Sequence, residues 1–138
     1  MKRILSLTLT LLIIISMCTL VASCAQGDNG KLLYTEDTAL GTGSKTFTFV
    51  FDDFEGNDIT FTISTNKTIL ADALREHDLI DGEEGDFGLY VKRVNGILHD
   101  FDKDATYWSL YIGDDYALTG VDTTEITDGA TYRFKATR

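Results

Sequence analysis

The sequence is poor in the residues that several functional classes require. Its two cysteines are too few for a disulfide framework or a four-ligand zinc site. Basic residues are also scarce, because 12 Lys and Arg stand against 22 Asp and Glu, giving a formal net charge of −10. Such a chain repels nucleic-acid phosphates and anionic lipid headgroups, so we expect no nucleic-acid partner. The domain must therefore be stabilised by its hydrophobic core.

Groups suited to catalysis are few as well. The only histidines are His77 and His99, and neither a Gly-x-Ser-x-Gly nor a His-Glu-x-x-His motif occurs. His77 ends a predicted helix, where a cation is favoured, so a structural role fits it better than that of a base. Carboxylates are abundant, which leaves a glycosidase pair as the one catalytic alternative. We expect no enzyme activity and assign no catalytic residue.

The N-terminus has the pattern of an export signal. Met1-Lys2-Arg3 is followed by an apolar stretch at residues 4–17 that ends near small residues. Leu20-Val21-Ala22-Ser23-Cys24 resembles the lipobox of bacterial lipoproteins. The resemblance implies a diacylglycerol on Cys24 and removal of the signal peptide, residues 1–23. Loss of Lys2 and Arg3 would change the formal net charge from −10 to −12 and leave no free thiol for catalysis.

Two alternatives to the lipid anchor remain open. Ordinary secretory cleavage near Ala22 would leave Cys24 as a free thiol, and an uncleaved membrane anchor would need about 20 apolar residues. We expect an exported protein, anchored in the cell membrane by Cys24 and facing outside the cytoplasm. Residues 24–44 are rich in Gly, Asp and Thr and are predicted to be a flexible tether. The folded domain is then residues 45–138.

Periodicity within this domain predicts a small α+β fold. Apolar residues at 69, 70, 73 and 74 gather on one side of a helix over 68–77, which Thr68 caps and Asp72 supports near its positive end. Asp81-Gly82-Glu83-Glu84-Gly85 breaks that helix. Strands are predicted at 46–51, 59–63, 87–94, 107–112 and 131–136, with an Asn95-Gly96 turn after the third. The order ββ-α-βββ favours a single-domain, β-grasp-like sheet with one packed helix.

Several short motifs add a family resemblance. They are Tyr107-Trp108-Ser109-Leu110-Tyr111-Ile112-Gly113, Gly120-Val121-Asp122 and Thr127-Asp128-Gly129-Ala130-Thr131-Tyr132-Arg133-Phe134, preceded by the helix 68–74 and the turn 94–97. In this order they resemble the C-terminal β-domain of transcobalamin and intrinsic factor, and the bacterial domain DUF4430, over residues 45–137. The resemblance implies a ligand-binding β-grasp domain outside the cell. It also implies cobalamin or a related corrinoid as ligand, although this chain has no room for the helical barrel that completes the transcobalamin site.

The resemblance and the aromatic residues together select a candidate ligand site. Tyr107 and Trp108 are adjacent in a strand, so one should lie in the core and the other at the surface. Aromatic side chains serve both cores and recognition surfaces. By resemblance, the loop 116–119 faces the ligand, although a plain connecting loop is the alternative. The predicted ligand-binding residues are Tyr107, Trp108, Tyr116, Leu118 and Thr119.

Acidic clusters are interpreted as surface features. Asp100, Asp102 and Asp104 alternate as at the start of a calcium loop, but Ala105 and Tyr111 replace the glycine and glutamate that an EF-hand requires. A solvated loop is favoured and Ca²⁺ is the alternative. A second acidic group is also assigned to the surface: Asp81, Glu83, Glu84 and Asp86. We predict no metal site.

Two functions fit these features. The first is a lipid-anchored extracytoplasmic module that binds a small molecule or cofactor. The alternative is a cell-surface structural or interaction module without a small ligand, which would hold a surface or transporter protein by a sheet edge or exposed aromatics. A concave apolar pocket beside Trp108 and residues 114–120 would favour the first, and a flat aromatic patch the second.

Overall fold

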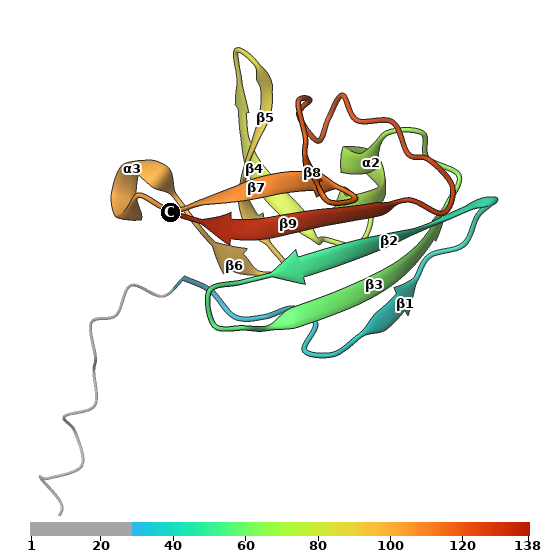
Figure 1. Ribbon diagram of the computed structural model, residues 1–138, viewed down its shortest axis with the longest axis horizontal. Helices are drawn as coiled ribbons and strands as arrows, with labels where there is room; N and C mark the ends of the chain where they lie inside the picture. The colour runs from blue at the N-terminus through green and yellow to red at the C-terminus, as the bar shows by residue number, and fades with distance from the viewer. Residues whose placement is uncertain (1–28) are drawn as a thin grey trace, which may run out of the picture.

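Alternating apolar and polar residues build a mixed six-stranded sheet. The structure is a computed structural model that describes residues 29–138. The strands of this sheet are β1 (Thr38–Leu40), β2 (Lys45–Asp52), β3 (Asp58–Thr65), β7 (Tyr107–Ile112), β8 (Asp115–Tyr116) and β9 (Thr131–Thr137), in the order β1-β3-β2-β9-β7-β8. β2 pairs antiparallel with β3 and parallel with β9, so the first long strand and the last lie side by side at the centre (Figure 1).

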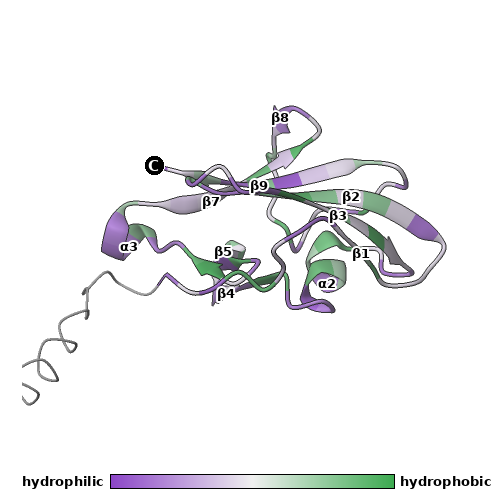
Figure 2. Cartoon of the chain, turned by 90° about the horizontal axis from the view of Figure 1, so that it is seen from below, coloured by the Kyte–Doolittle hydropathy of each residue, from purple (hydrophilic) through white to green (hydrophobic). Residues whose placement is uncertain are grey.

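A second layer covers one face of this sheet. It contains the helix α2 (Leu70–Arg75) and a three-stranded sheet of β4 (Ile80–Gly85), β5 (Gly88–Val94) and β6 (Ile97–Leu98). A one-turn helix, α3 (Phe101–Asp104), leads into β7. Figure 2 shows α2, β4 and β5 beneath the large sheet, and hydrophobic residues occur in both layers.

The core lies between the two layers. Phe47, Phe49 and Phe51 of β2 are buried on one face, as the alternation predicts, and they pack with Tyr132, Phe134 and Ala136 of β9. The aromatic rings contact one another, with centroids 5.8 Å apart for Phe49 and Phe61 and 6.1 Å for Phe49 and Phe134. Edge and offset contacts of this kind add to the burial of apolar area. The predicted α+β, β-grasp-like class is confirmed.

The start of α2 differs from the prediction. Ile69 is the N-cap residue and makes no side-chain capping bond, so Thr68 does not cap the helix. Backbone carbonyls from a distant loop take that role, because Leu70 N–H donates to the Thr124 carbonyl at 2.9 Å and Ala71 N–H to the Val121 carbonyl at 3.1 Å. The orphan donors of the first turn are therefore satisfied by tertiary contacts, which tie the 121–124 loop to the helix.

Two acidic segments form regular structure that was not predicted. Residues 81–85 are not a plain break, because they lie in β4 and pair with β5. The run from Asp100 to Asp104 contains α3, whose N-cap Asp100 is buried and accepts from Asp102 N–H. The structure therefore has two sheets where one was expected, and it has a second short helix in addition to the predicted one.

The structure also corrects the extent of the predicted tether. β1 pairs in parallel with β3, and the Tyr34 ring meets Phe61 edge-on at 5.3 Å. Asn95 bonds both backbone groups of Tyr34, accepting from its N–H and donating to its carbonyl, each at 2.9 Å. We call residues 29–40 the N-terminal strap, because this segment lies against both sheets. The signal peptide and Cys24 fall outside the described residues.

Candidate ligand-binding groove

A groove lies where the predicted ligand residues converge. It has a volume of about 220 Å³ and is bounded by β5, β7 and the loop that follows β8. Most of its lining residues have aliphatic or aromatic side chains, although polar atoms contribute almost as much of its surface: Leu89, Tyr90, Val91, Tyr107, Trp108, Leu110, Tyr116, Ala117, Thr119, Gly120, Val121 and Phe134. An apolar concavity with a few polar groups at its edge is typical of small-molecule sites.

The floor of the groove is rigid because its residues belong to the core. Trp108 is 6% exposed, and its ring lies 5.4 Å from that of Phe51 and 4.7 Å from that of His99. Its indole Nε1–H donates to the Lys92 carbonyl at 3.2 Å, which joins β7 to β5. Tyr107 is half-buried on the opposite face of the strand and contacts Phe101 edge-on at 6.1 Å. The prediction that one of these neighbours lies in the core is confirmed, and that residue is Trp108.

The loop beside the groove is held by hydrogen bonds to both layers. Ala117 N–H donates to the Leu110 carbonyl at 2.9 Å, and Thr119 Oγ1 lies 2.9 Å from Thr124 Oγ1. Leu89 N–H of the β4–β5 hairpin donates to Asp122 Oδ2 at 3.0 Å. The loop and the hairpin are thus fixed to each other, which preorganises the groove.

Asp122 is a polar group that the sequence did not single out as a site residue. Its second carboxylate oxygen, Oδ1, is buried and has no hydrogen-bond partner within residues 29–138. A side chain added at Gly88, where φ is +99°, would meet the Asp122 carboxylate at about 2.5 Å. Gly88 therefore allows the close approach of hairpin and loop.

The structure brings most of the predicted ligand residues together. Tyr107, Trp108, Tyr116 and Thr119 line the groove, although they come from β7, β8 and the following loop. Leu118 does not line it and is 98% exposed beside it. Contact of these five side chains with a ligand stays a prediction.

Four exposed apolar side chains belong to the segments that bound the groove, and we call them the rim: Phe87, Tyr90, Tyr116 and Leu118. Phe87 lies in the turn of the β4–β5 hairpin, which stands out from the sheet beside the loop after β8 (Figure 1). Phe87 is fully exposed, and Tyr116 is 58% exposed while meeting Tyr111 edge-on at 5.6 Å. Exposed apolar side chains that form one patch are typical of a contact surface.

Lys92 forms ion pairs with two acidic residues, one in β4 and one at the start of α3. Lys92 Nζ lies 3.0 Å from Glu83 Oε1 and 3.3 Å from Asp100 Oδ2. The hydrogen bond to Glu83, followed by the bond and charge of Asp100, raises the pKa of Lys92 against the effect of its desolvation. Within residues 29–138, no three His, Cys, Asp or Glu side chains are placed to hold a metal ion.

His99 is a buried group that the sequence did not mark as a site residue. Its burial lowers the pKa of the imidazole, outweighing the opposing charges of Asp104 and Asp53, while the charge of Arg138 lowers it further. The pKa of Asp104 is lowered, mainly by the hydrogen bond from the Thr106 hydroxyl. No periodic pattern could have indicated His99, because its environment comes from three separate segments.

No helix in the described part of the chain is long and apolar enough to cross a membrane.

The same architecture occurs in solved structures of other proteins. No curated protein matches the chain. A protein from Ruminococcus gnavus ATCC 29149, described as a putative metal binding protein, has a similar crystal structure with a TM-score of 0.65 and 24% identity. The alignment covers 69% of this chain and 98% of that protein.

Haptocorrin in complex with Cbi is also similar, with a TM-score of 0.53 and 19% identity. The alignment covers 72% of this chain but only 26% of haptocorrin. At 24% and 19% identity, the two similar structures establish the fold of this chain and nothing further. The predicted resemblance is thereby confirmed at the level of the fold. The family model for a domain of unknown function, DUF4430, matches residues 67–138, which is just over half of the sequence, and the chain therefore belongs to the DUF4430 family.

Proposed function

We propose that this protein is a lipid-anchored, extracytoplasmic binding module whose groove holds one side of a small molecule, with a corrinoid as the first candidate. One observation carries the proposal. One groove, between β5, β7 and the loop after β8, is lined by four residues selected from the sequence as ligand contacts: Tyr107, Trp108, Tyr116 and Thr119. The complex of haptocorrin with Cbi supports the choice of ligand class.

The size of the groove limits how the ligand is held. Pockets that enclose a drug-sized ligand have volumes of roughly 300–1,000 Å³, and this groove has about 220 Å³. A corrinoid would therefore insert an edge or substituent and rest its face on the rim. Its other face would stay open, and we infer that a second surface or transporter protein covers it.

Titration of the full chain in detergent with cobinamide tests the proposal. Trp108 is the only tryptophan in the sequence and lines the groove, so binding should quench its fluorescence. Tyr116→Ala should weaken binding about tenfold, because a lost aromatic contact of about 1.4 kcal/mol corresponds to that factor. Calorimetry gives the affinity independently of the fluorescence.

Leu33→Ala is the matched control, because Leu33 is an exposed apolar residue that does not line the groove. It should leave the cobinamide affinity unchanged. Equal weakening by both variants, or no binding to the full chain, would reject the corrinoid. In the second case Phe87 and Leu118, which are almost fully exposed, favour the interaction module instead.

The anchor is a separate part of the proposal and rests on residues 1–24 alone. Fatty-acid labelling of bacteria that express the chain should mark the wild type and leave Cys24→Ser unlabelled. Equal labelling of both would place the lipid elsewhere. Complete absence of label in the wild type would favour ordinary secretion.

A further inference from the structure

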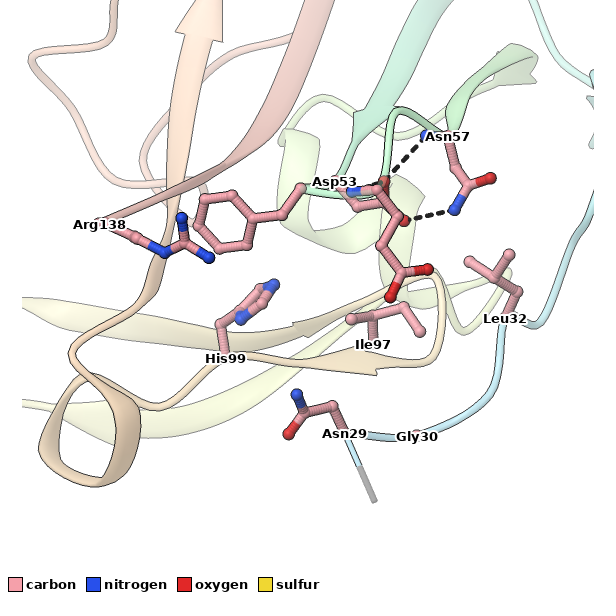
Figure 3. A pocket seen from close by; sticks show the side chains of 10 residues that line it. Asn29, Gly30, Leu32, Asp53, Asn57, Ile97, His99 and Arg138 are labelled. Atoms are coloured by element: carbon pink, nitrogen blue, oxygen red, sulfur yellow. Dashed lines mark hydrogen bonds between the residues drawn. The ribbon is translucent and has the colours of Figure 1, made fainter. Parts of the chain in front are cut away.

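A second and larger pocket lies on the other side of Trp108. It has a volume of about 540 Å³ and is enclosed by the N-terminal strap, the β2–β3 turn, β6 and the C-terminal residue. In Figure 3, His99 and Ile97 face Asp53 across the pocket, with Arg138 at one end and Leu32 at the other. The Trp108 ring, which lines the groove, lies 4.7 Å from the ring of His99, which lines this second pocket.

The tautomer of His99 follows from its neighbours. The Thr106 hydroxyl donates to Asp104 Oδ1, and the Thr106 N–H donates to the same oxygen at 2.9 Å. The hydroxyl proton is thus used, so Thr106 Oγ1 accepts from His99 Nδ1–H across their 2.8 Å separation. The neutral ring carries its proton on Nδ1, and Nε2 presents a lone pair.

That lone pair is an unmatched acceptor. His99 is 6% exposed, and Nε2 is buried with no partner within residues 29–138. Burying an acceptor without a donor is costly, and most such groups in folded proteins are paired. Burial also lowers the pKa of His99, which keeps the ring in the accepting form. A ligand that brings an N–H or O–H donor would complete the site.

The charged side chains around the pocket indicate which charge the ligand should carry. Asp53 and Glu55 place two carboxylates on its wall, and Arg138 places one guanidinium at its end. The Asp53 carboxylate is fixed because it accepts from Glu55 N–H, Asn57 N–H and Asn57 Nδ2 at 2.7–2.9 Å. The Glu55 carboxylate is exposed and has no bonded partner among the described residues. The charged side chains that line the pocket, Asp53, Glu55 and Arg138, leave an excess of one negative charge.

Arg138 forms no ion pair with Asp53 or Glu55, and its guanidinium lies over the Phe54 ring at 4.4 Å. Phe54 in turn meets His99 edge-on at 5.2 Å. Leu32 and Ile97 add an apolar wall. The pocket therefore combines a neutral acceptor, a free carboxylate and apolar surface.

We propose that this pocket binds a primary ammonium group carried on a short apolar chain, with an N–H donated to His99 Nε2 and the positive charge facing Glu55. An anion would meet two carboxylates and find no donor at Nε2. Among the described residues, no three ligand side chains are close enough together to hold a metal ion. The site is distinct from the groove, so it does not depend on the corrinoid proposal.

The test uses n-butylammonium as probe and the full chain in detergent. ¹⁵N NMR of the His99 ring should show Nε2 shifting on titration, with Nδ1 much less affected. Butyltrimethylammonium has the same charge and chain but no N–H, so it should bind at least tenfold more weakly. Equal binding of the two probes would overturn the proposal, as would the absence of any Nε2 shift.

Two variants separate the roles of the residues. Glu55→Gln removes the free carboxylate from an exposed side chain and should weaken n-butylammonium binding severalfold. Glu36→Gln makes the same charge change at an exposed residue outside the pocket and should have no effect. His99→Phe keeps an aromatic ring against Phe54 and Trp108 and should abolish the preference for the primary over the quaternary ammonium. Retention of that preference in a folded His99→Phe protein would exclude Nε2 as the acceptor.

Discussion

Asn95→Ala is expected to lower the free energy of unfolding by about 2–4 kcal/mol, because it leaves two partly buried backbone groups without partners. The Asn95 side chain is fully buried, and its amide bonds both the N–H and the carbonyl of Tyr34. Alanine would also have to adopt the left-handed backbone that Asn95 holds at φ +47°. Denaturant unfolding followed by circular dichroism measures the change.

Two further variants separate these contributions. Asn95→Gly relieves the backbone cost but removes both hydrogen bonds, so it should remain strongly destabilised. Asn66→Ala is the matched control, because Asn66 also accepts from a backbone N–H, that of Ser44 at 2.9 Å, but at an exposed position. We expect it to cost less than about 1 kcal/mol. Equal losses for Asn95→Ala and Asn66→Ala would mean that the N-terminal strap is not part of the cooperative fold.

The strap could not be predicted from the sequence, for a physical reason. Its composition is rich in small and polar residues, and the contacts that hold it come from far along the chain. Tyr34 and Asn95 are 61 residues apart, and β1 is only three residues long, too short to display alternation. Leu33 N–H adds a bond to the Asn95 carbonyl at 3.0 Å. Local patterns carry no information about such pairings.

The long strands could be predicted because each has one buried face. β2, β3, β7 and β9 lie within two residues of their expected bounds. β4 could not be predicted from the sequence because Ile80 is its only buried residue. The other residues of β4 are glycines and acidic residues, and they pair with β5 through the backbone. A strand at the edge of a sheet with a solvated face has no hydrophobic alternation to reveal it.

The two pockets also differ in how far the sequence could predict them. The groove could be predicted in outline, because several of its residues lie in motifs that resemble a known family. The pocket at His99 brings together the β2–β3 turn, β6 and the strap, whose joint position only the fold determines. His99 directly precedes the acidic run that begins at Asp100 in the sequence, and its contacts with Thr106 and Trp108 depend on how α3 leads into β7.

Trp108→Ala is expected to lower the free energy of unfolding by about 3–5 kcal/mol, the cost of truncating a large buried aromatic residue. The indole is 6% exposed, packs between Phe51 and His99, and bonds the Lys92 carbonyl. Its removal would open a cavity between the two sheets and join the groove to the His99 pocket. Circular dichroism should follow the unfolding, because the substitution removes the only tryptophan.

Trp108→Phe is the informative companion, since it keeps most of the buried ring and loses only the indole N–H bond and some volume. We expect it to cost about 1–2 kcal/mol, well below the alanine variant. A cost below about 1 kcal/mol for Trp108→Ala would contradict a core position and favour a side chain free to contact ligand. If the core position holds, lost binding in Trp108→Ala would reflect the collapse of the groove. Exposed Tyr116, whose removal leaves the core intact, is therefore the residue on which the ligand proposal must be judged.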